Sequence, residues 1–200
     1  MAFYKYISTI LHPIVIPTIG VMLYFLVVPT SYNKEQRFYM LSLVFITTYL
    51  IPLLLLIFFK RLRIIKNYRV ETIKERKIPI ILMVFLYFFL GQTMNTLYVK
   101  DLSLLFYSTS FGLFVLFLFF FFQKKISIHL LSLGIPLGFF MLLSHTYQQS
   151  FLIEIICIFL ISGLVGSSRL HLQAHTHKEV FSGFFLGIFS VFLVFFIYNR

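Results

Sequence analysis

The residues best suited to chemistry lie close together near the C-terminal end of the chain. Ser168 and Arg169 are followed after five residues by His175, and Glu179 stands four positions beyond this histidine. If a helix begins at His175, the histidine and Glu179 lie one turn apart on the same face. A carboxylate placed there fixes the tautomer of the imidazole and stabilises its cationic form, as a nucleophile or a base requires. Arg169 adds a planar guanidinium, whose geometry suits phosphate oxygens.

The elements that must position these residues are hydrophobic. Of the 200 residues, 60% are hydrophobic and only 12% are charged, and the mean hydropathy is +0.97. Soluble domains carry about 25% charged residues. The long apolar runs therefore indicate helices of about 20 residues that cross a bilayer. We expect an all-α integral membrane protein, a polytopic transmembrane helix bundle with one domain over residues 1–200.

Seven candidate spans follow one another along the chain. In the last of them Gly183 and Gly187 repeat at helical spacing, which lets a helix pack closely on a neighbour. The turn between the fifth and sixth spans is short, so we expect six or seven crossings in all. The predicted spans are residues 10–29, 38–59, 79–98, 103–122, 128–146, 150–167 and 179–198.

The C-terminal pattern resembles the third signature of the type 2 phosphatidic acid phosphatase superfamily, the membrane phosphatases related to vanadium haloperoxidases. That signature reads Ser-Arg, five residues, His, three residues, Asp. Ser168, Arg169 and His175 match it, and Glu179 stands where the family has aspartate. The resemblance implies that His175 attacks phosphorus and becomes transiently phosphorylated. It also implies that Glu179 orients the histidine and that Ser168 and Arg169 bind the phosphate.

A second signature of this superfamily, Pro-Ser-Gly-His, has a partial match at the start of the fifth span. Here Ser127 and His129 keep their spacing, while isoleucines replace the proline and the glycine. The resemblance implies that His129 is the general acid that protonates the leaving oxygen and that Ser127 is a phosphate ligand. The missing glycine puts a close approach of the backbone to the phosphate in doubt.

The first signature, Lys, six residues, Arg-Pro, falls in a strongly basic segment over residues 60–78. Arg69 and Arg76 keep the spacing of the two cations, and Pro79 follows two residues late. The resemblance implies that Arg69 and Arg76 bind phosphate. Alternatively, most cations of this segment set the topology and attract anionic headgroups, at about 1 kcal/mol each. The basic residues concerned are Lys60, Arg61, Arg63, Lys66, Arg69, Lys74, Arg76 and Lys77.

The number of predicted spans places the three segments on one face of the membrane. Two spans separate the basic segment from Ser127, and two more separate Ser127 from Arg169. An even number of crossings returns the chain to the same face, so the segments can form one site within a family-like core over about residues 66–190. This face carries 13 basic residues and the other face carries 4. The positive-inside rule therefore predicts a site at the cytoplasmic face, and we expect the cytoplasmic membrane of a bacterium.

The resemblance implies a membrane phosphatase that acts on a lipid phosphate or diphosphate through a phosphohistidine, without a metal or another cofactor. The net charge of +11 raises the question of nucleic acid. The basic residues, however, flank apolar spans and leave no length for a nucleic-acid module, so no such partner is expected.

Two alternatives stay open. The chain can be a non-catalytic relative that binds a lipid headgroup or a partner subunit. It can also be a metal-binding or metal-transport protein, because His171, His175 and Glu179 follow one another at i, i+4 and i+8, with His177 nearby. That stripe requires one continuous helix. His12, far upstream, is expected at a membrane interface without a catalytic role.

Overall fold

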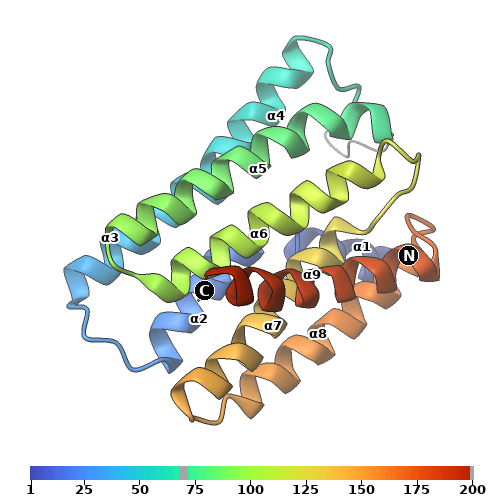
Figure 1. Cartoon of the computed structure of the whole chain (residues 1–200). Helices are drawn as coiled ribbons and strands as arrows, with labels where there is room; N and C mark the ends of the chain where they lie inside the picture. The colour runs from blue at the N-terminus through green and yellow to red at the C-terminus, as the bar shows by residue number, and fades with distance from the viewer. Residues whose placement is uncertain (68–71, 199–200) are drawn as a thin grey trace.

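The computed structural model describes residues 1–67 and 72–198, and the regular structure of these residues is helical without strands. Within them, six helical segments are long and apolar enough to cross a membrane (Figure 1). They are the α3–η1–α4 segment (Lys34–Phe45, Ile46–Leu50 and Ile51–Arg61), α5 (Ile73–Thr96), α6 (Lys100–Phe119), α7 (Ile128–Tyr147), α8 (Leu152–His171) and α9 (His177–Tyr198). The predicted all-α polytopic bundle is confirmed.

The outer surface of the bundle is apolar, as a lipid-facing surface must be. On α9, Phe181, Phe185 and Phe189 repeat every four residues and are each more than half exposed. Gly183 and Gly187 are buried on the same helix. A stripe of exposed phenylalanines beside a buried stripe of small residues is typical of a helix that faces lipid on one side and protein on the other.

The chain enters the bundle through two short helices, α1 (Ala2–Ile10) and α2 (Ile16–Val27), rather than through the predicted span over residues 10–29. Pro13 lies in the bend between them, where it supplies no backbone N–H and restricts the residue before it. α2 has 12 residues. Its length of about 18 Å is well below the roughly 30 Å of a bilayer core. The first span is therefore wrong as a single helix.

The segment after α2 continues without regular structure to residue 33, and Arg37 compensates for the missing helix. Backbone carbonyls that leave a helix need new hydrogen-bond donors, above all at membrane depth. The guanidinium of Arg37 donates to three such oxygens, those of Phe25, Thr30 and Tyr32.

α5 begins at Ile73, six residues before the predicted third span. The hydroxyl of Thr72 accepts a hydrogen bond from the backbone nitrogen of Glu75 at 3.3 Å and so caps the helix. Arg76 therefore lies on a helix rather than in a loop. Arg69, the other cation of the first signature, lies outside the described residues.

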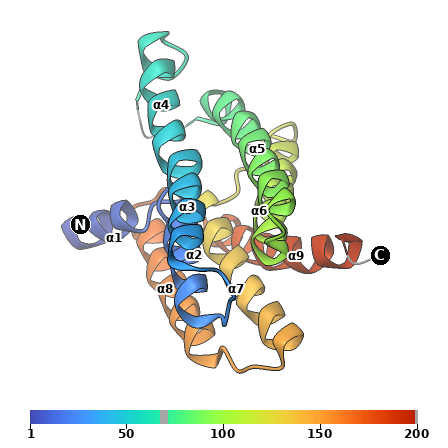
Figure 2. The same cartoon turned by 90° about the vertical axis from the view of Figure 1, so that its left-hand side faces the viewer.

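The segments that carry the three signatures lie at the same end of the bundle, on the right of Figure 1. α5 and α6 stand between the first and second segments, and α7 and α8 stand between the second and third. α1 lies at this end as well and projects to the side of the long helices in Figure 2. The even number of helices between the segments, predicted from the sequence, is thus present in the fold.

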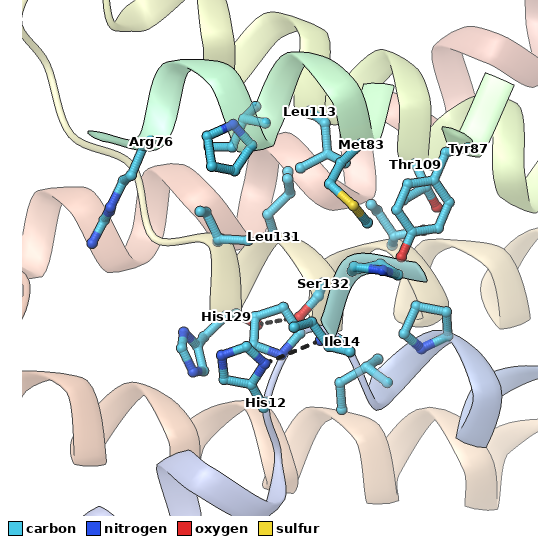
Figure 3. A pocket seen from close by; sticks show the side chains of 18 of the residues that line it. His12, Ile14, Arg76, Met83, Tyr87, Thr109, Leu113, His129, Leu131 and Ser132 are labelled. Atoms are coloured by element: carbon cyan, nitrogen blue, oxygen red, sulfur yellow. Dashed lines mark hydrogen bonds between the residues drawn. The ribbon is translucent and has the colours of Figure 1, made fainter. Parts of the chain in front are cut away.

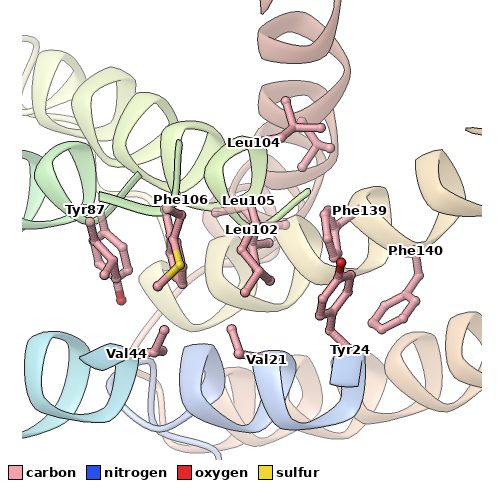
Figure 4. Packing of buried hydrophobic residues seen from close by; sticks show 14 of the residues in the cluster. Val21, Tyr24, Val44, Tyr87, Leu102, Leu104, Leu105, Phe106, Phe139 and Phe140 are labelled. Carbon is pink, nitrogen blue, oxygen red and sulfur yellow. The ribbon is translucent and has the colours of Figure 1, made fainter. Parts of the chain in front are cut away.

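α2, α6 and α7 meet in a hydrophobic core, in which Figure 4 shows Tyr24, Phe106 and Phe139 among the packed side chains. At the end of the bundle away from the signature segments, the hydroxyl groups of Tyr24 and Tyr147 donate to Oδ2 of Asp101 at 2.8 and 2.6 Å. This carboxylate at the start of α6 ties α2 and α7 together. The C-terminal part of α2 therefore points toward the far end of the bundle.

α7 and α9 touch through their backbones. A side-chain carbon added at Gly187 would lie 2.6 Å from the carbonyl oxygen of Leu131 and 2.8 Å from the backbone nitrogen of Ile135. One turn earlier, a carbon added at Gly183 would collide with the carbonyl oxygen of Ser127. The predicted role of Gly183 and Gly187 in close helix packing is confirmed.

Replacement of Gly187 by alanine should therefore destabilise the protein by about 1–3 kcal/mol, because backbone atoms cannot move away as a flexible side chain can. The chain has no tryptophan, so circular dichroism during heating in detergent is a suitable readout. Gly163→Ala on α8 is the matched control, because an added carbon there meets nothing within 4 Å. Equal melting temperatures for the two variants would contradict the packing described here.

Candidate active site

The predicted pair of His175 and Glu179 is in direct contact. Nδ1 of His175 lies 2.8 Å from Oε2 of Glu179. An ionised carboxylate only accepts hydrogen bonds. Nδ1 of His175 therefore carries the proton, and Nε2 keeps its lone pair. This is the tautomer that a histidine needs for an attack through Nε2.

Glu179 also belongs to the cap of α9. The backbone nitrogen of Thr176 donates to Oε2 of Glu179 at 3.3 Å, and the backbone nitrogen of Glu179 donates to Oγ1 of Thr176 at 3.4 Å. This reciprocal pair is a capping box, with Thr176 as the N-cap. α9 begins at His177, after the nucleophile candidate. The cap, and not a shared helix face, thus holds the carboxylate against His175.

His175 is buried, with 7% of its surface exposed. Burial lowers its pKa below the ordinary value of 6.5, the hydrogen bond from its ring to Glu179 opposes this effect, and the charges of Arg169 and Arg76 lower the pKa further. The imidazole is therefore neutral near pH 7. Its charge and its tautomer both suit a nucleophile.

His175 lines a cavity of about 220 Å³ at the signature end of the bundle. Arg76 from α5, His129 from the start of α7 and Arg169 from the last turn of α8 line the same cavity. In Figure 3, the side chain of Arg76 extends from α5 toward the end of the cavity that holds His129. Among the described residues no Asp or Glu lines the cavity. This composition favours a negatively charged ligand.

Most of the rest of the cavity wall is apolar. Its side chains come from α2, α4, α5, α6 and α7, five elements that surround the space between the polar end and the middle of the bundle. The cavity therefore joins a cationic end to a hydrophobic body. Representative lining residues are Ile16, Leu55, Phe59, Met83, Leu113 and Ile135.

Two polar atoms of the predicted site are buried without a hydrogen-bond partner among the described residues. They are Nε of Arg169 and Oγ of Ser127. An unsatisfied buried donor costs about 1–3 kcal/mol, and more for a charged group. A bound anion would satisfy Arg169, which lines the cavity. Ser127 is fully buried next to His129 and does not line the cavity itself.

α1, at the N-terminus of the chain, contacts Ser168, Arg169 and His129. Nη1 of Arg169 donates to Oγ of Ser8 at 2.8 Å, and Nε2 of His129 lies 3.3 Å from the carbonyl oxygen of Ser8. The hydroxyl of Ser168 donates to the carbonyl oxygen of Tyr4. Ser168, predicted as a phosphate ligand, is thus bound to α1 and does not line the cavity. The two oxygens of Ser8 contact Arg169 and His129 much as phosphate oxygens would.

His12 is a residue of this site that the sequence interpretation missed. It lines the cavity, and its ring packs edge to face on the ring of His129, with 5.4 Å between their centroids (Figure 3). The sequence interpretation expected His12 at a membrane interface and gave it no part in the site. No spacing in the sequence relates His12 to the signatures, because it comes from the bend between α1 and α2, outside residues 66–190.

The metal-binding alternative required one continuous helix through residues 171–179, and the structure does not contain it. α8 ends at His171 and α9 begins at His177. The ring of His171 stacks on Tyr4, with 4.2 Å between the centroids. Within residues 1–67 and 72–198, no three His, Cys, Asp or Glu side chains gather as possible metal ligands. The stripe of His171, His175 and Glu179 is therefore broken.

Comparison of the chain with known protein families, with curated proteins and with solved structures finds no match. The relation to the type 2 phosphatidic acid phosphatase superfamily thus stays a prediction from the signature residues.

Replacement of Glu179 by glutamine should lower the pKa of His175, because the hydrogen bond and the charge of the carboxylate both raise it. The pKa is measured by an NMR titration of isotope-labelled histidine in detergent micelles, with His175→Ala to assign the resonance. Glu154→Gln, at the far end of α8, is the control and should leave this pKa unchanged. A pKa of His175 that stays constant or rises in Glu179→Gln would refute the electrostatic role of Glu179.

Proposed function

We propose that this protein is a membrane phosphatase that hydrolyses a lipid phosphate or diphosphate through a phosphohistidine intermediate. The observation that carries the proposal is the 2.8 Å contact of His175 with Glu179, at a cavity that His175 shares with two arginines. Arg76 and Arg169 would neutralise the transferring phosphoryl group, which is the main demand of this chemistry.

The proposed reaction has two steps, and residues of the cavity and Glu179 carry them out. Nε2 of His175 attacks phosphorus, a P–N bond forms, the P–O bond to the lipid breaks, and the imidazolium form of His129, stabilised by the bound phosphate, gives a proton to the leaving oxygen. Water then attacks the phosphohistidine, the P–N bond breaks, and His129 takes a proton from that water as inorganic phosphate forms. Glu179 stabilises the positive charge of the phosphorylated ring through Nδ1–H.

The apolar body of the cavity supports a lipid substrate over a small soluble phosphate. A hydrocarbon chain can lie against side chains such as Phe59 and Met83 without burying an unpaired polar group, whereas a small soluble phosphate would leave this part of the cavity unfilled. The headgroup then meets the cationic end, which lies where the long helices end. From the excess of basic residues on this side, we also infer that this end faces the cytoplasm of a bacterium.

The contacts of α1 favour a second candidate, a non-catalytic relative that binds a headgroup or a partner subunit. Ser8 engages Arg169 and His129, and Tyr4 engages Ser168. In a protein without catalysis these contacts would persist as permanent structural links. In a phosphatase, the substrate phosphate would accept from donors of Arg169 other than Nη1, which donates to the Ser8 hydroxyl.

Phosphate release separates the two candidates. We expect purified protein in detergent to release phosphate from at least one of phosphatidate, phosphatidylglycerol phosphate and polyprenyl diphosphate. His175→Ala should reduce the rate by about 1,000-fold or more, because it removes the nucleophile. His177→Ala is the matched control, since His177 is exposed two residues away.

Two results would contradict the proposal. Release that survives His175→Ala would exclude the phosphohistidine mechanism. No release from any of the three lipids by the wild-type protein would favour the non-catalytic relative.

A further inference from the structure

His12 reaches the cavity from a part of the chain that carries none of the three signatures. It lies in the bend between α1 and α2 and lines the cavity together with Arg76, His129, Arg169 and His175. Its ring is 5.4 Å from that of His129, at an interplanar angle of 82°. The cationic end of the cavity therefore includes a third imidazole.

The backbone determines which ring nitrogen of His12 carries a proton. The N–H group of Ile14 donates to Nδ1 of His12 at 3.3 Å, drawn as a dashed line in Figure 3. An acceptor nitrogen has no proton, so the neutral ring carries its proton on Nε2. Burial and the charge of Arg169 lower the pKa of His12. The ring therefore stays neutral near pH 7 and offers one N–H donor.

The Nε2–H group of His12 forms no hydrogen bond with another described residue. A polar donor in a partly buried, largely apolar cavity is costly unless a ligand accepts its hydrogen bond. The nearby charges of Arg169 and Arg76 favour an anionic acceptor. A neutral imidazole N–H can polarise a bound oxygen without adding a further positive charge to the site.

We propose that His12 is a phosphate-binding residue, whose Nε2–H donates a hydrogen bond to a non-bridging oxygen of the phosphoryl group held between Arg76 and Arg169. This inference rests on the proposed phosphatase function of the same cavity. It assigns the N-terminal segment, which the signatures do not include, a direct part in substrate binding.

Two conservative variants distinguish this role from a purely structural one. The side-chain amide of asparagine replaces the Nδ1 position of histidine and can still accept from the N–H of Ile14. The longer glutamine places its amide near the Nε2 position and can still donate into the cavity. A structural role is therefore rescued by His12→Asn, and a phosphate-binding role is rescued by His12→Gln.

We expect KM for the lipid phosphate to rise about tenfold or more in His12→Asn, because one hydrogen bond to a charged group is lost. His12→Gln should stay within a few-fold of the wild type. Equal KM values in the two variants, or rescue by asparagine alone, would overturn the assignment of His12. Circular dichroism in detergent is the check that both variants are folded.

A binding measurement tests His12 independently of turnover. Inorganic phosphate is titrated into isotope-labelled wild-type protein and into His175→Ala, and the ring resonances of His12 are followed by NMR. We expect the Nε2–H resonance of His12 to shift with phosphate in both proteins. A shift without lipid phosphate hydrolysis would support His12 while contradicting the phosphatase, and a constant resonance would overturn the role of His12 alone.

Discussion

The backbone contact between α7 and α9 is the constraint on which the site depends. Gly183 and Gly187 leave no side chain between the helices, so the start of α7 lies directly on α9. At that point the backbone nitrogen of Ser127 donates to the carbonyl oxygen of Glu179 at 3.1 Å. This bond joins the segment of His129 to the segment of His175 within one turn of each residue. A larger residue in the contact would move the two histidines apart.

The second physical feature is the excess of positive charge at one end of a largely apolar cavity. Two arginines line the cavity and no carboxylate among the described residues does. Glu179 instead contacts His175 and the cap of α9, where it neutralises part of the charge without blocking the anion site. Nε of Arg169 is buried without a hydrogen-bond partner among the described residues, and a buried charged donor of this kind is costly. A phosphate group of a lipid would lower that cost and bring its apolar chain into the hydrophobic part of the cavity.

Much of the fold was predictable from composition and from apolar periodicity. A bilayer requires helices of about 20 apolar residues, and such runs are visible in the sequence. They predict membrane crossing, the all-α architecture and the even number of helices between the three polar segments. Less of the candidate site could be predicted from the sequence. The contact of His175 with Glu179 was predictable from spacing, although the capping box of Thr176 that positions it was not recognised. His12 and Ser8 could not be predicted, because their place depends on how α1 folds back over α8, and no local pattern encodes that long-range packing.

The most direct test of the central claim is the identity of the phosphorylated residue during turnover. Wild-type protein is mixed briefly with a labelled lipid phosphate, quenched in alkali and analysed by mass spectrometry under conditions that preserve phosphohistidine. We expect covalent phosphate on Nε2 of His175, the nitrogen opposite the contact with Glu179. Phosphate on a different residue, or phosphate release without any covalent intermediate, would contradict the proposed mechanism.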